Sequence, residues 1–153
     1  MSTPNPLASL QPPWVHLVVT KNTPSLSTYL SYPDDAVVRL IRGARCRTKA
    51  GLLGELAQAL QFPEYFGHNW DALTDCVTDL SWLPAPAYSL VLDDADLLLA
   101  DDRQDFTTFI AIMQGAGHMW GIARPDAPAI PFHLVLAFTD HSDDERGREG
   151  DIG

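Results

Sequence analysis

The amino-acid sequence predicts a single α/β domain with a mainly parallel sheet. Stretches typical of strands alternate along the chain with stretches typical of helices, which is the order that a parallel sheet with crossover helices requires. Residues 88–92 are almost continuously apolar, as in a strand that is covered on both faces. The 153 residues can bury a core without metal or disulfide support, and no apolar run approaches the ~18 residues of a membrane-spanning helix.

Residues 1–35 are predicted to form an N-terminal extension ahead of the main domain. Residues 1–13 are rich in Pro, Ser and Asn, so we expect no regular structure there. Residues 14–20 have the β-branched and aromatic character of a strand, and a short helix is expected from Ser25 to the residue before Pro33. The N-terminus has neither a basic start nor an apolar segment, which argues against a signal peptide and predicts a cytoplasmic protein.

Residues 36–140 are predicted to form the main domain, and residues 141–153 a flexible, charged tail. The strands of the main domain are expected at 37–41, 88–92 and 132–138, where β-branched and aromatic residues gather. Each is separated from the next by at least one stretch of helical character.

Two of the expected helices follow each other directly. Thr48 is positioned to cap the first, which runs to about Leu60 with its leucines on one face. Asn69 is positioned to cap the second, which runs to about Leu80, and Gly67 is expected to supply the turn before it.

The third expected helix precedes the last strand. Asp101 or Asp102 is positioned to cap it, and Gly115 and Gly117 are expected to weaken its end. Its apolar face comprises Phe106, Phe109, Ile110, Met113 and Ala116.

The charge of the chain is strongly negative and unevenly distributed. Acidic residues outnumber basic ones 20 to 10, for a formal net charge of −10. Nine aspartates and a single arginine, without lysine or glutamate, lie between Asp71 and Asp105. Such a surface repels nucleic acid and anionic membranes and attracts basic proteins. The two cysteines, Cys46 and Cys76, form no CxxC pair and are expected to be free thiols.

The second helix carries the least expected pattern in the sequence. Its apolar residues recur at helical spacing and are Trp70, Leu73, Val77 and Leu80. Burying this stripe turns Asp71, Thr74, Asp75 and Thr78 toward solvent. Three aspartates four residues apart, the last being Asp79, repel each other by about 0.2–0.5 kcal/mol per pair. Only Asp71, near the helix start, gains from the helix dipole, so the pattern indicates a function outside the fold.

Two enzyme-like interpretations of the sequence compete with a binding function. Asp93 and Asp94 follow a strand and have the oxygen ligands of a cation site or a phosphoacceptor. However, the only lysines, Lys21 and Lys49, do not follow a late strand as a receiver domain requires, which favours a strand-ending acidic turn.

An acid–base pair formed by Asp71 and Asp75 lacks the burial that would separate the two pKa values. The five histidines show no ligand spacing: His16 and His133 fall in strands and are expected to be structural, whereas His68 precedes the acidic helix in a loop. We therefore predict no catalytic residue, no metal site and no cofactor.

The stretch from Phe62 to Cys76 carries a family resemblance. Its matching elements are Pro63-Glu64-Tyr65, Gly67, Asn69, Asp71-Ala72-Leu73 and Asp75-Cys76, with Thr78 two residues further on. This stretch resembles the signature of the barstar family, intracellular inhibitors of barnase-type ribonucleases. The order of strands and helices extends the similarity over about residues 36–139.

The resemblance implies a small, mainly parallel three-stranded sheet packed by helices. Residues 1–35 lie outside the resemblance and are expected either to add a fourth, edge strand to this sheet or to mediate self-association. The resemblance also implies that the protein binds and blocks a ribonuclease active site and is not an enzyme. Asp75 is implied as the central anchor and Asp71 as its companion. The other implied partner-binding residues are Tyr65, Phe66, Gly67, Asn69, Trp70, Thr74 and Thr78.

The sequence also departs from the family pattern. Thr74 stands where the family has a tryptophan just before its key aspartate, so the aromatic bulk is expected at Trp70 or Trp82. A further acidic contact of the family, on a later helix, has no clean counterpart here: Asp102, Gln104 and Asp105 lie near the expected place, with Arg103 between them. These departures keep open an alternative in which the same fold serves as an immunity module for a different basic toxin. The free protein is expected to be a monomer.

Overall fold

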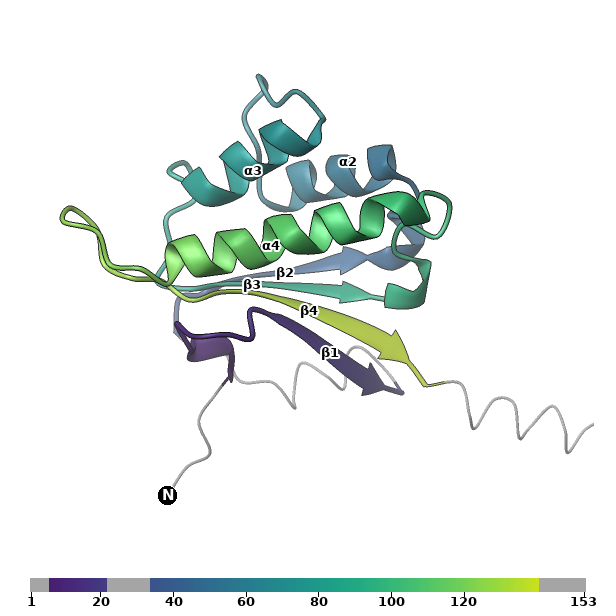
Figure 1. Ribbon diagram of the computed structural model, residues 1–153, viewed down its shortest axis with the longest axis horizontal. Coiled ribbons are helices and arrows are strands. Elements are labelled where there is room, and N and C mark those ends of the chain that lie inside the picture. The colour runs from purple at the N-terminus through teal and green to yellow at the C-terminus, as the bar shows by residue number, and fades with distance from the viewer. Residues whose placement is uncertain (1–5, 22–33, 141–153) are drawn as a thin grey trace, which may run out of the picture.

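The computed structural model describes residues 6–21 and 34–140, and these form a four-stranded parallel sheet with three α-helices on one face (Figure 1). The strand order is β1-β4-β3-β2, and every neighbouring pair is parallel. The strands are β1 (Val15–Thr20), β2 (Val37–Arg42), β3 (Tyr88–Asp93) and β4 (Phe132–Thr139). The helices are α2 (Lys49–Ala59), α3 (Trp70–Asp79) and α4 (Phe106–Trp120).

The predicted α/β class and parallel sheet are confirmed, and the N-terminal extension does supply a fourth strand. This strand, β1, lies at the edge of the sheet and pairs with β4 along its whole length. The short helix expected before Pro33 and the predicted tail 141–153 lie outside the described residues.

The core lies between the sheet and the helices. All six residues of β3 are buried, because helices cover one face of this central strand and the N-terminal segment covers part of the other. Helix α2 lies over β2, and α4 lies over β4 and β1. Helix α3 packs mainly on α4, so it forms the part of the helical layer that is furthest from the sheet (Figure 1).

The predicted caps of the first two helices are confirmed. The Thr48 hydroxyl accepts a hydrogen bond from the Gly51 amide at 3.0 Å, and the Asn69 side chain accepts one from the Ala72 amide at 2.7 Å. Each bond satisfies an amide that the first turn of a helix leaves without an internal partner. The start of both helices is therefore fixed by a local side chain.

The predicted cap of α4 is wrong. A short 3₁₀ helix, η4 (Arg103–Asp105), leads into α4, and neither Asp101 nor Asp102 caps it. Asp102 instead accepts a hydrogen bond from the first amide of α2, that of Lys49, at 2.7 Å, and Asp101 pairs with Arg47 at 3.0 Å. The two aspartates thus join the start of α2 to a segment about fifty residues away in the chain.

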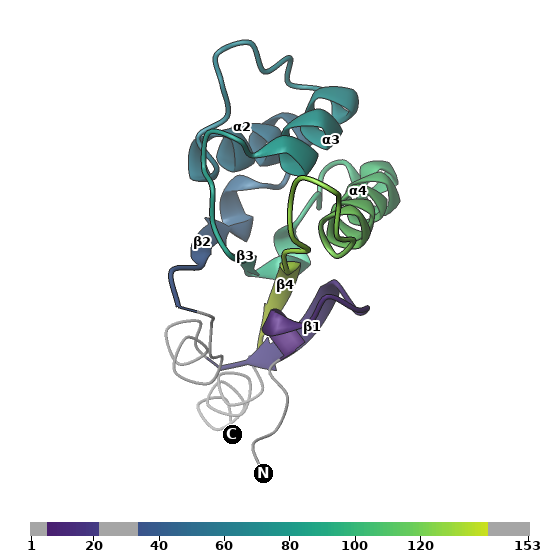
Figure 2. The same cartoon turned by 90° about the vertical axis from the view of Figure 1, so that its left-hand side faces the viewer.

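The expectation that residues 1–13 lack regular structure is wrong for residues 6–8. Residues Pro6–Ala8 form a 3₁₀ helix, η1, on the side of the sheet that faces away from the α-helices (Figure 2). Leu7 in this helix is only 1% exposed and packs on Val91, Val135 and Ala137 of the sheet. Burying an apolar side chain of this size stabilises by about 1.5–3 kcal/mol, which holds the segment in place.

The extension also contacts the helical side of the sheet. Trp14 packs against Gly117 of α4, where a Cβ atom would overlap the indole. The centres of the Trp14 and His118 rings are 5.5 Å apart. Helix α4 continues through Gly115 and Gly117 to Trp120, so the two glycines do not end it. Gly117 is there because α4 and the extension approach closely.

Two histidines attach the extension to the sheet, as structural histidines were expected to do. His133 is fully buried and donates its Nε2 hydrogen to the Ser9 carbonyl at 2.7 Å. In the neutral ring, Nδ1 then carries no hydrogen and accepts one from His16 Nε2 at 2.8 Å. The two hydrogen bonds are satisfied with both rings neutral.

Burial lowers the pKa of both rings from the usual value of 6.5, and for His16 the neighbouring His133 lowers it further. Well above pH 6.5 the two rings are neutral in both the folded and the unfolded protein, and their contribution to folding stability is fully present. Below that pH the unfolded chain takes up protons that the folded protein does not. The histidine pair therefore makes folding stability fall as the pH drops.

We predict that the free energy of unfolding, measured with urea, falls between about pH 7.5 and about pH 5.5, and that the fall is smaller in His16→Gln. Glutamine retains a donor for His133 Nδ1 but does not titrate. The control His118→Gln, at an exposed ring, should show the wild-type fall. An equal fall in His16→Gln and wild type would contradict the assignment.

Candidate protein-binding site

Helix α3 is held by its apolar face. Leu73, Cys76 and Val77 are buried in the main core, and the indole of Trp120 in α4 donates a 2.7 Å hydrogen bond to the Val77 carbonyl. The C-cap residue is Leu80, which has a left-handed backbone (φ 49°). Its side chain is buried and is the last member of the apolar stripe of α3. The predicted apolar stripe is thereby confirmed.

The opposite face of α3 carries the carboxylates. Asp71, Asp75 and Asp79 are exposed, as their spacing predicts. Across the described residues, none of these three carboxylates makes a hydrogen bond or an ion pair. Within the fold they experience mutual repulsion, and only Asp71, in the first turn, lies where the helix dipole favours a negative charge.

The loop before α3 separates into exposed and buried aromatic residues. Tyr65 is 77% exposed, whereas Phe66 is only 6% exposed and packs edge-on against Phe62 at 4.9 Å. Phe66 was predicted to contact a partner, but its side chain lies in the core, where it can only shape the loop. Tyr65 is the aromatic side chain that this loop presents to solvent.

Gly67 was expected to supply the turn into α3, but its backbone is not in the left-handed region. The left-handed residue is His68, with φ of 52°, and its ring donates to the Phe66 carbonyl at 3.2 Å. Gly67 is exposed and next to the Asn69 cap, whose side-chain amide donates back to the Gly67 carbonyl at 3.3 Å. These local bonds hold the loop in one conformation beside the carboxylates.

The tryptophans near the site have mainly structural roles. Trp70 is partly buried against Phe109, and the Lys49 ammonium lies 5.2 Å from the centre of its ring. Trp82 packs on Phe62 and donates its indole hydrogen to the Leu60 carbonyl at 2.9 Å. Trp70 is therefore partly in the core and partly at the surface beside the carboxylates, whereas Trp82 packs beneath the loop and stabilises it.

The threonines of α3 lie beside the carboxylates. Thr74 is exposed and Thr78 is half-buried. Their hydroxyls donate back along the helix, to the Trp70 carbonyl at 3.0 Å and to the Thr74 carbonyl at 2.7 Å. With these donors used internally, the two side chains mainly present methyl groups.

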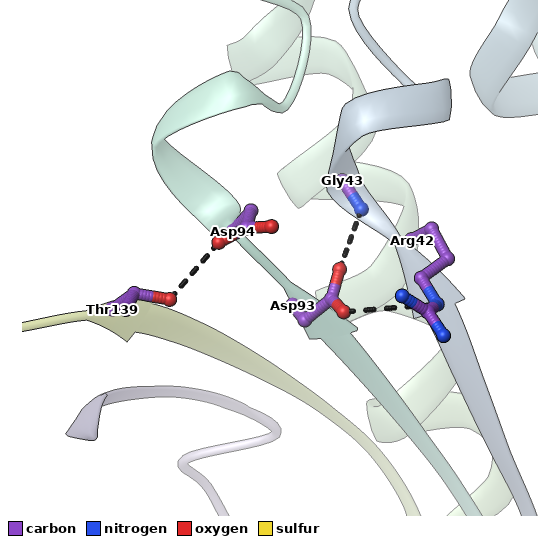
Figure 3. A network of polar contacts seen from close by, with 5 residues as sticks. All are labelled: Arg42, Gly43, Asp93, Asp94 and Thr139. Atoms are coloured by element: carbon purple, nitrogen blue, oxygen red, sulfur yellow. Dashed lines mark hydrogen bonds and ion pairs between the residues drawn. The ribbon is translucent and has the colours of Figure 1, made fainter. Parts of the chain in front are cut away.

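The second acidic cluster, after β3, is part of the fold. Figure 3 shows Asp93 between Arg42 and Gly43: its carboxylate accepts from the Gly43 amide at 2.9 Å and lies 4.0 Å from the Arg42 guanidinium. Asp94 accepts from the Thr139 hydroxyl at 2.9 Å. These contacts fasten the ends of β2, β3 and β4 together. No group of three or more metal-ligating side chains gathers anywhere in residues 6–21 and 34–140.

The two cysteines are free and buried. Burial, with Glu55 and Asp93 nearby, raises the pKa of Cys46 to about 12. Burial, and then the charges of Asp75 and Asp79, also raise the pKa of Cys76. Both side chains therefore remain protonated at neutral pH and are poor nucleophiles.

A comparison with protein-family models matches residues 36–137 to the model described as Barstar (barnase inhibitor). The match covers about two thirds of the chain and includes β2, β3, most of β4, the three α-helices and the loop before α3, but not β1. The chain belongs to the barstar family, whose members are inhibitors and not enzymes. A search of curated proteins returns no match. In the described part of the chain, no helix has the length and apolar character needed to cross a membrane.

We predict that Asp75→Ala does not destabilise the fold and raises the free energy of unfolding slightly, by up to about 1 kcal/mol. Alanine is a better helix former than aspartate, and the substitution removes two unfavourable charge pairs. The contrasting variant Leu73→Ala, two residues away on the buried face, should cost about 2–5 kcal/mol. Chemical denaturation of the two variants checks this, and a large loss in Asp75→Ala would show that the carboxylate is structural.

Proposed function

We propose that this member of the barstar family inhibits a basic, barnase-type ribonuclease by placing α3 and the loop before it in the enzyme's active site. The observation that carries the proposal is the state of Asp75. Its carboxylate is exposed, has no partner across the described residues, and projects from a helix whose other face is fixed in the core. Such a charge is available to a partner without rearrangement of the inhibitor.

The chemistry of the proposed target matches this arrangement. An enzyme that cleaves RNA must bind a phosphate backbone, so its active site presents basic side chains. Asp75 would take the position of a phosphate among them, with Asp71 one turn earlier as its companion. The excess of acidic residues over the whole chain, 20 against 10, would attract the basic enzyme before contact.

The residues around the two aspartates would complete the contact. Tyr65 supplies an exposed aromatic ring, and Gly67 and Asn69 allow the enzyme to approach the backbone of the loop. Trp70, Thr74 and Thr78 border the carboxylates on the helix itself. Phe66, from its buried position, would keep the loop in the shape that the partner meets.

We further propose that the protein acts in the cytoplasm, is a monomer when free, and needs no cofactor and no nucleic acid. Its two cysteines support this location, since both are free thiols. A second candidate, an immunity module for a different basic toxin, is supported by Thr74, which stands where the family has a tryptophan. The proposed mode of binding is the same for both, and only the partner differs.

We predict that the wild-type protein inhibits a purified barnase-type ribonuclease and that Asp75→Ala weakens binding by about 2–5 kcal/mol, because truncation leaves buried basic groups of the enzyme unpaired. Titration calorimetry measures the affinity. Asp96→Ala is the matched control: Asp96 is also exposed, and its loss changes the net charge equally, but it lies on η3 (Ala95–Leu97) after β3.

Unchanged affinity in Asp75→Ala would contradict the assignment of the site. If the wild-type protein does not bind the ribonuclease, while a different basic toxin is bound in a manner that depends on Asp75, the second candidate is the correct one.

A further inference from the structure

The surface beside Asp75 contains a groove that no part of the described chain fills. The groove runs between α3 and α4 and has a volume of about 550 Å³. Thr74 and Thr78 line it from α3, and Thr107, Ala111, Ile112 and Gly115 line it from α4. It exists because small residues face each other where these two helices pack.

The lining of the groove is uncharged and largely apolar. From Phe106 to Trp120, α4 contains no Asp, Glu, Lys or Arg, although several of its residues are exposed. On α3, the hydroxyls of Thr74 and Thr78 already donate to the helix backbone. An exposed helix face without charge is unusual for a surface that meets only water, and depletion of charge is typical of the centre of a protein interface.

The groove is continuous with the carboxylates. Successive residues of a helix turn by ~100°, so Thr78 lies ~60° around α3 from Asp75, on the side that faces α4. The surface therefore changes from charged to apolar within one helix width. A partner whose basic side chain pairs with Asp75 brings its neighbouring side chains directly over the groove.

We propose that this groove receives a large apolar side chain of the same basic ribonuclease, next to the arginine or lysine that pairs with Asp75. This inference rests on the proposed function and adds to it a second, uncharged determinant of which enzyme is bound. Charge complementarity selects the occupant, since the acidic border attracts a basic protein and the groove itself offers nothing to a charged side chain. Association then depends mainly on the carboxylates, and dissociation on the filling of the groove.

Gly115→Leu tests the groove without touching the carboxylates. A Cβ atom at Gly115 would meet no other atom within 4 Å, so the leucine side chain can enter the groove, and leucine favours a helix more than glycine does. The matched control is Gly54→Leu in α2, where a Cβ is equally unobstructed and which lines no part of the groove. Ala111→Leu provides a second groove variant, and thermal unfolding confirms that each variant is folded.

With purified barnase-type ribonuclease as the probe, we expect Gly115→Leu and Ala111→Leu to raise Kd at least tenfold through a faster dissociation rate. Gly54→Leu should remain within twofold of wild type. If wild type binds and Asp75→Ala weakens binding, but both groove variants bind as tightly as wild type, the groove is not occupied and this inference is wrong. If wild type does not bind at all, the proposed function fails, and the inference fails with it.

Discussion

The burial of one face of α3 is the constraint on which the rest of the site depends. Leu73, Cys76 and Val77 enter the core, and the bond from Trp120 to the Val77 carbonyl fixes the helix to α4. Because successive residues of a helix turn by ~100°, this burial leaves Asp71 and Asp75 no orientation other than outward. The same packing sets α3 against α4 and so creates the groove beside the carboxylates.

The fold tolerates an unfavourable surface here because its stability comes from elsewhere. Asp93 and Asp102 are acidic as well, but each is used by the fold: one fastens the strand ends and the other satisfies the first amide of α2. Asp75 has no such use within the described residues. Asp93 and Asp102 make hydrogen bonds that stabilise the fold, whereas Asp75 contributes only repulsion. This difference distinguishes a binding site from general surface charge.

Besides the parallel sheet, which follows from the order of strands and helices, the features predicted correctly from sequence are local ones. The caps at Thr48 and Asn69, the apolar stripe of α3 and the buried strand β3 each follow from residues close together in the chain. The errors concern contacts between distant segments, such as Asp102 with Lys49 and Leu7 with β4, which no local pattern encodes. The left-handed backbone at His68 is an error of a different, local kind, because Gly67 before it is the residue type that usually adopts that conformation. The groove was also missed, since it depends on how two helices pack.

The central claim is that outward carboxylates on a rigid helix draw a basic active site onto this protein. The most direct test is the association rate constant with a barnase-type ribonuclease, measured by stopped flow from about 20 mM to about 500 mM salt. The account predicts at least a ~10-fold decrease over this range, and a much flatter dependence for the double variant Asp71→Asn, Asp75→Asn. An association rate that does not change with salt would contradict it.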